Sequence, residues 1–568
     1  MKKIFSIFLI SLVSVIVSCS DNFTDVPPAQ GQLTPDNIAT DGEGSPLLLS
    51  SLEFLLNATY ARLYGNNTGD PWLGTADNWW MDAMTDDAHK GSDQSDQPNL
   101  EELQTYIYNT ANPYFQVKWE TLIAGIVQAN EVIFEGARVA DSENIVAQAR
   151  FLKGHFYFEL QRIWKNVPYI QPGEDASQVP NTGPVWSDIE ADFQFAIDNL
   201  PETQPEIGRV NQWTAKAYLG KVLLQQGKNT EALVLLNDVI DNGPYVLATE
   251  FQDNFTELGE NGSESIFAIQ FTTEDGVAGT ENGNLGGTLT HPAGGPYASC
   301  CGFFQPTQDL TNAFKTDNNG LPLLDTYNES DIANDQGLES FEEDGETPTD
   351  FALYDEPVDP RLDYTVGRRG VDFNGFGLHP GKAWIRDQSW SGPYLSKKNT
   401  YKNGELGSSQ GAGPWGQQSS GINYNVIRFA DVLLMAAEAE VEAGSLTNAL
   451  ELVNRVRERA KNMTPVKGNE TTYLIEPYMN FPSVEYARKA VRHERRLELA
   501  MEGHRLFDLV RYGDAYAELI ISEFISNEQR ILPDYNPNTF AARNLVFPIP
   551  VASIDASGNV LEQNPEWQ

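Results

Sequence analysis

The hydrophobic residues in the first half of the chain recur at the spacing of buried helices. Residues 144–164 carry apolar side chains around most of a helix, which is typical of a helix with little solvent-exposed surface. Residues 185–200 have apolar positions three and four apart, and Pro201 predicts the end of that helix. We therefore expect two packed helices in this part of the chain.

Two later segments, residues 214–245 and residues 426–460, each have the pattern of a helix–turn–helix unit. Their small and apolar residues fall at the positions of the tetratricopeptide consensus, which repeats every 34 residues. Both units place a glycine before the second helix, first Gly227 and then Gly444. Because such a repeat buries its apolar face only against neighbours, we predict a scaffold of several packed helices.

The sequence changes character between the two units, from about residue 272 to residue 424. Gly, Asp, Asn and Ser are common there, and short strands are suggested only by residues 265–271 and 362–367. Loop regions of this length are usually functional or disordered, and the many aromatic residues disfavour disorder. The predicted fold is mainly α: a tetratricopeptide-like helical-repeat scaffold carrying a large, irregular, loop-rich ligand face with a few short strands.

The start of the chain has the layout of a lipoprotein signal. Two lysines precede an apolar run that is too short to span a bilayer and that ends at Val17-Ser18-Cys19. This ending resembles a bacterial lipobox, so we predict a signal peptide at residues 1–18, lipidation of Cys19 and anchoring to a membrane by the lipid. The alternative is a plain secreted protein whose cysteine is incidental.

The charge of the chain excludes one class of partner. The 80 acidic residues outnumber the 38 basic ones and give a formal net charge of −42. Nucleic acid and other polyanions require a basic surface, so we expect no nucleic-acid partner. Aromatic residues make up 11% of the chain, and they must either fill the core or lie on a binding surface.

Four long motifs occur along the chain: AQARFLKGHFYFELQRIWKNVPY (147–169), NYNVIRFADVLLMAAEAE (423–440), RHERRLELAMEGHRLFDLVRYG (492–513) and the ending NLVFPIPVASI…LEQNPEW. Together with the lipobox they resemble the SusD/RagB family, the surface glycan-binding lipoproteins of Bacteroidetes. The resemblance implies a SusD-like helical fold, a protein that is not an enzyme, and a location on the outer membrane, exposed at the cell surface. It also implies a SusC-like TonB-dependent transporter as the partner, to which the protein would pass oligosaccharide.

The resemblance and the repeats divide the chain into three parts. The signal peptide occupies residues 1–18, and an N-terminal SusD-like helical region with the first repeat units follows at residues 19–255. The C-terminal RagB/SusD region, residues 256–568, would hold the loop-rich insert at 272–424 and the final repeat helices.

The chain shows no sequence signature of catalysis or of a cofactor. No nucleophile elbow, phosphate-binding glycine loop, redox pair or calcium-binding loop is present. His493 and His504 have no cysteine or second histidine at ligand spacing, so we predict no metal site. The charges of residues 492–511 recur three and four residues apart, and we interpret that helix as laced with ion pairs rather than as an anion site.

Residues 74–91 are the first candidate ligand site. Trp79 and Trp80 lie beside Asp77 and Asp86, and a sugar ring is held by aromatic planes on its faces and by charged hydrogen-bonding groups at its edges. In the resembled family, the corresponding loop often contributes to the glycan site. The alternative is a buried tryptophan pair at a helix start, with the aspartates as caps.

The second candidate site surrounds Cys300 and Cys301, which could bond only to each other within the mature chain. They form either a strained vicinal disulfide, of the kind found at binding sites, or two reduced and buried thiols. The residues predicted to bind ligand with them are Arg368, Trp390 and Tyr394, and further aromatic candidates nearby are Phe303, Trp384 and Trp415.

The predicted ligand is a neutral polysaccharide or its oligosaccharides. The acidic surface would repel uronate or sulfated chains unless local arginine and lysine compensate. The combination of a cysteine pair with tryptophans resembles fructan-binding members of the family, which implies a fructan-like polymer. The alternative is an adaptor or lid of the transporter that has no glycan site of its own.

Overall fold

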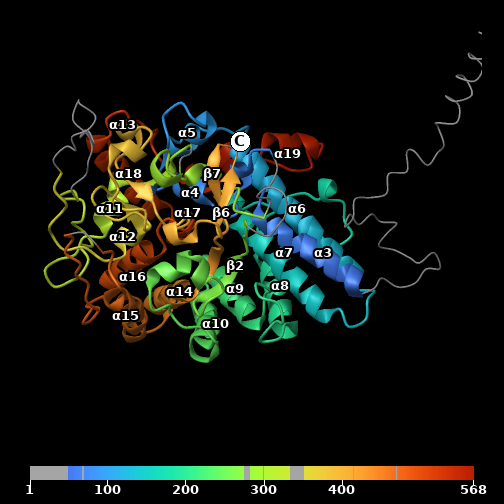
Figure 1. The fold of residues 1–568 in the computed structure, drawn as a ribbon. Coiled ribbons are helices and arrows are strands. Elements are labelled where there is room, and N and C mark those ends of the chain that lie inside the picture. The colour runs from blue at the N-terminus through green and yellow to red at the C-terminus, as the bar shows by residue number, and fades with distance from the viewer. Residues whose placement is uncertain are drawn as a thin grey trace, which may run out of the picture.

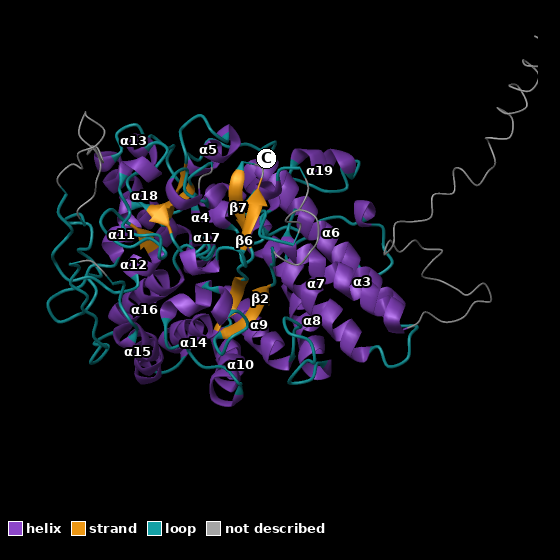
Figure 2. Ribbon diagram, in the orientation of Figure 1, coloured by secondary structure: helices purple, strands orange, loops and turns teal. Residues whose placement is uncertain are grey.

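The computed structural model describes residues 49–66, 69–273, 282–297, 300–332, 351–413, 415–467 and 470–568. The predicted signal peptide and Cys19 lie outside these residues. Helices dominate the described structure, and each sheet has only two strands (Figure 2). No helix among the described residues is both long enough and apolar enough to span a membrane.

The N-terminal helices pack as a series of neighbours, as the periodicity predicted. Each of α6 to α9 contacts the next helix along the chain, and α3 lies against α6 and α7 (Figure 1). Close approach depends on glycine, because a Cβ atom at Gly220 would come within 2.6 Å of Leu236. The helices are α3 (Leu49–Ala61), α6 (Pro113–Gly136), α7 (Glu143–Trp164), α8 (Trp186–Asn199), α9 (Gln212–Gln225) and α10 (Asn229–Asn242).

The second repeat unit lies directly beside the first, although about two hundred residues separate them. Helix α14 packs against α9 and α10 on one side and against α15 and α16 on the other (Figure 1). The helical layer is therefore continuous across both halves of the chain. The C-terminal helices are α14 (Phe429–Ala443), α15 (Leu446–Asn462), α16 (Val484–Leu499), α17 (Arg505–Tyr512), α18 (Asp514–Ile531) and α19 (Val551–Ala556).

The strands form four antiparallel pairs: β1 with β3, β2 with β8, β4 with β5 and β6 with β7. Their bounds are β1 (Ala88–Gly91), β2 (Ser265–Ile269), β3 (Phe303–Pro306), β4 (Val366–Gly367), β5 (Leu395–Ser396), β6 (Gln410–Gly413), β7 (Gly416–Ser420) and β8 (Tyr424–Arg428). The shorter helices are α4 (Trp79–Asp82), α5 (Pro98–Gln104), α11 (Gln308–Ala313), α12 (Leu362–Thr365) and α13 (Gln388–Ser391).

One of the two predicted strands is present and the other is mostly helix. Residues 265–271 contain β2, as expected. Residues 362–367 instead form the helical turn α12 followed by the two-residue strand β4. The turn is favoured because Asp359 accepts hydrogen bonds from the backbone and side chain of the buried Arg361, which holds the chain in a bend before the turn.

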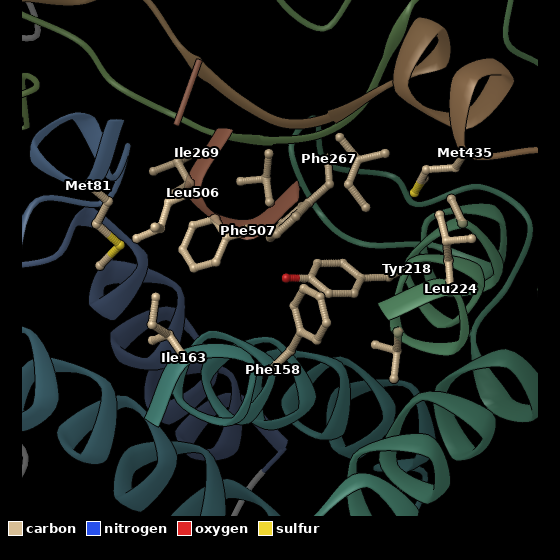
Figure 3. Close-up of a cluster of buried hydrophobic side chains, with 14 of the residues drawn as sticks. Met81, Phe158, Ile163, Tyr218, Leu224, Phe267, Ile269, Met435, Leu506 and Phe507 are labelled. Carbon is tan, nitrogen blue, oxygen red and sulfur yellow. The ribbon is translucent and has the colours of Figure 1, made fainter. Parts of the chain in front are cut away.

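A single hydrophobic core joins the N-terminal helices to the C-terminal half. Figure 3 shows Phe158 of α7 and Tyr218 of α9 converging with Phe267 of β2 and with Leu506 and Phe507 of α17. Phe158 and Tyr218 meet edge to face with their ring centroids 5.6 Å apart. Side chains that are far apart in the sequence therefore bury one another.

The arginines of α16 and α17 are ion-paired, as the sequence suggested, but mostly with distant elements. Arg495 binds Asp431 of α14, and Arg496 binds Asp87 and Asp309. Of the ion pairs made by these arginines, only that between Arg511 and Asp508 follows the helical spacing of three residues. The charge pattern thus ties α16 and α17 to the rest of the fold, with Arg492 as the exception.

Candidate ligand-binding site

The structure places Trp79 and Trp80 in the core, which corrects their prediction as ligand-binding residues. Their side chains are only 1% and 0% exposed. The Trp80 ring stacks on Phe547 at 5.9 Å, and the Trp79 indole N–H donates to the carbonyl of Gly286 at 2.9 Å. An indole whose faces are already covered cannot stack on a sugar, so the buried alternative describes this pair.

Asp77 and Asp86 are buried, and other residues of the protein occupy their carboxylates. Asp77 accepts hydrogen bonds from Thr75 and from Asn284, the latter at 3.2 Å. Asp86 binds Arg505 through two bonds of 2.7 and 2.8 Å. Burial by itself would raise the pKa of Asp86, but Arg496 and Arg505 outweigh it and lower this pKa to about 2.

Three residues predicted near the cysteines also have structural roles. Arg368 is buried and forms two bonds with Asp363, at 2.6 and 2.9 Å. The Tyr394 hydroxyl donates to Gln308 at 3.0 Å beneath the surface, and Trp390 is 5% exposed. The structure therefore offers none of these side chains to a ligand, because all three are buried.

Cys300 and Cys301 form a disulfide, one of the two states that the sequence left open. Cys301 is buried, whereas Cys300 is half-buried and reaches the surface just before β3. The Asp96 carboxylate lies within 4.8 Å of both sulfur atoms. Sulfur atoms of a disulfide lack the thiolate charge that metal binding requires, so we assign no metal to this cluster.

A pocket of about 400 Å³ opens beside the disulfide. Trp384 stands half-buried in its wall at the end of a short 3-10 helix, Lys382–Trp384. The backbone beneath the indole is Gly295, which has a φ of +70° and whose Cβ, if present, would come within 2.4 Å of the Trp384 ring. The residues lining the pocket are Ala293, Gly294, Cys300, Ala383, Trp384, Ile385 and Arg386.

Arg386 supplies the polar edge of this pocket. Its guanidinium binds Asp96 at 2.5 Å and Asp93 at 2.8 Å, and it donates to the Ser92 hydroxyl at 3.0 Å. One terminal nitrogen lies 4.0 Å from the Cys300 sulfur. These contacts hold the loop after β1 against the disulfide. Arg386 remains partly exposed, and its single positive charge faces two carboxylates.

Trp415 is an exposed tryptophan that is tied to the same place. Its side chain is 48% exposed and lies over the buried Trp72, with ring centroids 5.6 Å apart. The Gln418 side chain links it to the disulfide, because it accepts from the Trp415 backbone N–H at 3.0 Å and donates to the Cys300 carbonyl. We use the name aromatic face for the pocket residues Cys300, Trp384 and Arg386 together with Trp415, which is linked to Cys300 through Gln418.

The aromatic face offers the chemistry of ring recognition. Exposed indole surface and an apolar disulfide can pack against C–H groups, while Arg386 and its carboxylates can exchange hydrogen bonds with hydroxyls. Sequence reasoning identified Cys300, Trp384 and Trp415 but missed Arg386. The available signal was its position two residues after Trp384 in a loop rich in aromatic residues.

The sequence matches two known families. Residues 263–567 match the family described as SusD family, and residues 46–224 match one described as starch-binding associating with outer membrane. The SusD-like protein P2 of Formosa agariphila is 25% identical, and the match covers 100% of both chains.

Solved structures of similar proteins show the same fold. A SusD-like carbohydrate-binding protein from Bacteroides fragilis superposes with a TM-score of 0.66 at 22% identity, covering 91% of this chain and 99% of its own. Surface glycan-binding protein A from Bacteroides thetaiotaomicron, solved in complex with laminarihexaose, superposes with a TM-score of 0.63 at 19% identity, with the same coverage.

Proposed function

This chain belongs to the SusD family, and we propose that it is a carbohydrate-binding protein of the outer-membrane surface that is not an enzyme. It captures an oligosaccharide or polysaccharide on the aromatic face and delivers it to a SusC-like TonB-dependent transporter. The observation that carries the proposal is the pocket of about 400 Å³ lined by Cys300 and half-buried Trp384. The exposed Trp415 is linked to Cys300 through Gln418. Lipidation of Cys19 supplies the membrane anchor.

The charge of the aromatic face supports a neutral ligand. Arg386 is already paired with Asp93 and Asp96, so the three groups together carry a negative charge. A hydrogen bond from Ser95 is the main cause that lowers the pKa of Asp93, and Arg386 lowers it further, so this carboxylate stays ionised near neutral pH. A uronate or sulfate would meet repulsion here, whereas hydroxyl groups find both donors and acceptors.

Two neutral polymers are candidates for the ligand. Fructan is implied by the resemblance of the cysteine-and-tryptophan site to fructan-binding members of the family. Laminarin is the ligand named for a structural neighbour that is 23% identical to this chain. Both are neutral, so charge alone does not separate them and the test must include both.

Isothermal calorimetry of the chain lacking residues 1–19 tests this proposal against fructan, laminarin and an acidic polysaccharide. We expect heat of binding with a neutral polymer and a loss of affinity of about tenfold or more when Trp384 and Trp415 are both replaced by alanine. The matched control is Met479→Ala, which removes an apolar side chain that is 94% exposed and lies outside the pocket lining. If none of the three polysaccharides gives heat of binding, the alternative is favoured, in which the protein is a transporter adaptor without a glycan site.

A further inference from the structure

A second cavity of about 670 Å³ lies between helices α16 and α18. The loop that carries Tyr327 contributes to its lining, and Tyr516 and Leu519 of α18 form an apolar wall. Leu519 is 54% exposed, so this wall presents apolar surface to solvent. The α16–α18 cavity shares no lining residue with the pocket of the aromatic face.

Two of the arginines that line the α16–α18 cavity are occupied within the protein. Arg496 binds Asp87 at 2.7 Å and Asp309 at 2.9 Å, and Arg505 binds Asp86 at 2.7 Å. All five side chains are buried, and the carboxylates outnumber the guanidinium groups. Arg496 and Arg505 therefore leave no positive charge for a ligand.

Arg492, one helical turn before Arg496, is different. Its guanidinium lies 3.9 Å from the ring centre of Tyr512 and 4.5 Å from that of Tyr516. Its Nε atom is buried and has no hydrogen-bond partner among the described residues. Stacking on two rings holds the guanidinium plane but uses only its faces, so the terminal N–H groups remain for an acceptor. Glu442 is the acidic neighbour of this charge: its hydrogen bond with Arg488 is the main cause that lowers its pKa, and Arg492 lowers it further.

The acidic residues that line the cavity limit the class of ligand that can supply this acceptor. Asp325, Glu329 and Glu523 line the cavity at exposed positions. Lys489, which also lines the cavity, pairs with Asp325 at 2.5 Å. A polyanion would be repelled by these carboxylates. A ligand with a single anionic group could reach Arg492 and place its remaining surface against the apolar wall.

We propose that the α16–α18 cavity is a second carbohydrate site, which takes a sugar residue carrying one carboxylate, a uronate. The carboxylate accepts hydrogen bonds from Arg492, and the sugar ring lies against Tyr516 and Leu519. The need for an anionic group rests on Arg492, whereas the choice of a sugar rests on the proposed function. The protein would then hold neutral residues at the aromatic face and an acidic residue here.

Saturation-transfer NMR tests this site with methyl glucuronide and, as the neutral probe, methyl glucoside. The chain used lacks residues 1–19 and carries Trp384→Ala and Trp415→Ala, so that the aromatic face does not hold the neutral probe. We expect a signal from the glucuronide alone under conditions in which both are present, and an affinity loss of about tenfold or more in Arg492→Gln. The matched control is Arg138→Gln, which removes the same charge from an exposed arginine that stacks on Phe134 and pairs with Glu135 outside the cavity. This control should bind the glucuronide as the wild type does.

The outcomes separate this proposal from the proposed function. Trp384→Ala with Trp415→Ala should keep glucuronide binding, and Arg492→Gln should keep the binding of the neutral polymer. Equal signals from glucuronide and glucoside, or equal losses in Arg138→Gln and Arg492→Gln, would overturn the second site. Thermal unfolding of each variant checks that it is folded. If Arg492→Gln does not fold, a competition experiment with the wild-type chain tests the second site instead. In that experiment, methyl glucoside should fail to displace methyl glucuronide.

Discussion

Residues 74–91 and the aromatic face contain the same types of residue, yet only the aromatic face has exposed aromatic side chains. Both combine tryptophan with nearby aspartate. In the first, Trp80 is closed over by Phe547 and Tyr114, and the carboxylate of Asp86 is taken by arginines. In the second, Trp415 keeps 48% of its surface exposed. The comparison shows that a binding motif is defined by what covers it as much as by its residues.

Replacing Trp80 with alanine should give the largest effect on stability. The side chain is fully buried among aromatic rings, so its removal should lower the free energy of unfolding by about 3–5 kcal/mol. Urea unfolding measures this change. The folded fraction of this variant should bind the neutral glycan with unchanged affinity. If the variant instead lost affinity while its free energy of unfolding stayed the same, Trp80 would be a ligand-binding residue after all.

Acid should destabilise the fold through buried carboxylates such as that of Asp86. Burial opposes ionisation, but arginine partners lower the pKa values of Asp86, Glu159 and Asp508 to about 2 in the folded state. These groups therefore add stability that is complete above about pH 4.5 and is lost as the pH falls toward 2. Each contributes about 2–3 kcal/mol.

Urea unfolding measured at intervals between pH 6 and pH 2 follows this loss. Asp86→Asn should be less stable at pH 6 and should show a shallower decline with acid than the wild type. A decline of unchanged steepness would mean that Asp86 is not held ionised by its arginines.

Gly295→Ala should affect the aromatic face more than the fold. A Cβ atom at this left-handed position would collide with the Trp384 ring, and the backbone conformation itself disfavours alanine by about 1 kcal/mol. We expect a small loss of stability together with weaker glycan binding, measured by urea unfolding and calorimetry. Gly377→Ala, also at positive φ but with open space around its Cβ, is the control. This control should lose stability but keep its affinity for the glycan.

Reduction of the disulfide should have the smallest effect on stability. Cys300 and Cys301 are adjacent, so their bond closes almost no loop and removes little entropy from the unfolded chain. Cys300 lines the pocket, however, and we expect a few-fold loss of glycan affinity after treatment with a reductant. Unchanged affinity would show that the disulfide does not contact the ligand.

Much of the scaffold was predictable because helical periodicity is a local property. The expected helices at 144–164 and 185–200 correspond to α7 and α8 within one residue at each end. Both repeat units form as predicted, because their small residues are needed wherever two helices approach closely. The strand expected at 362–367 was wrong, because a buried arginine and its carboxylate bend the chain into a turn there.

The sequence by itself determined which residues could recognise a ring, and tertiary structure decided which of them are exposed to a ligand. Composition and order place tryptophan, cysteine and arginine in the chain, but exposure depends on elements hundreds of residues away. Phe547, near the C-terminus, covers Trp80, whereas Trp415 lies over Trp72 and keeps 48% of its surface exposed. Burial is a property of packing between distant segments, so hydrophobic pattern alone cannot distinguish a core tryptophan from a binding one.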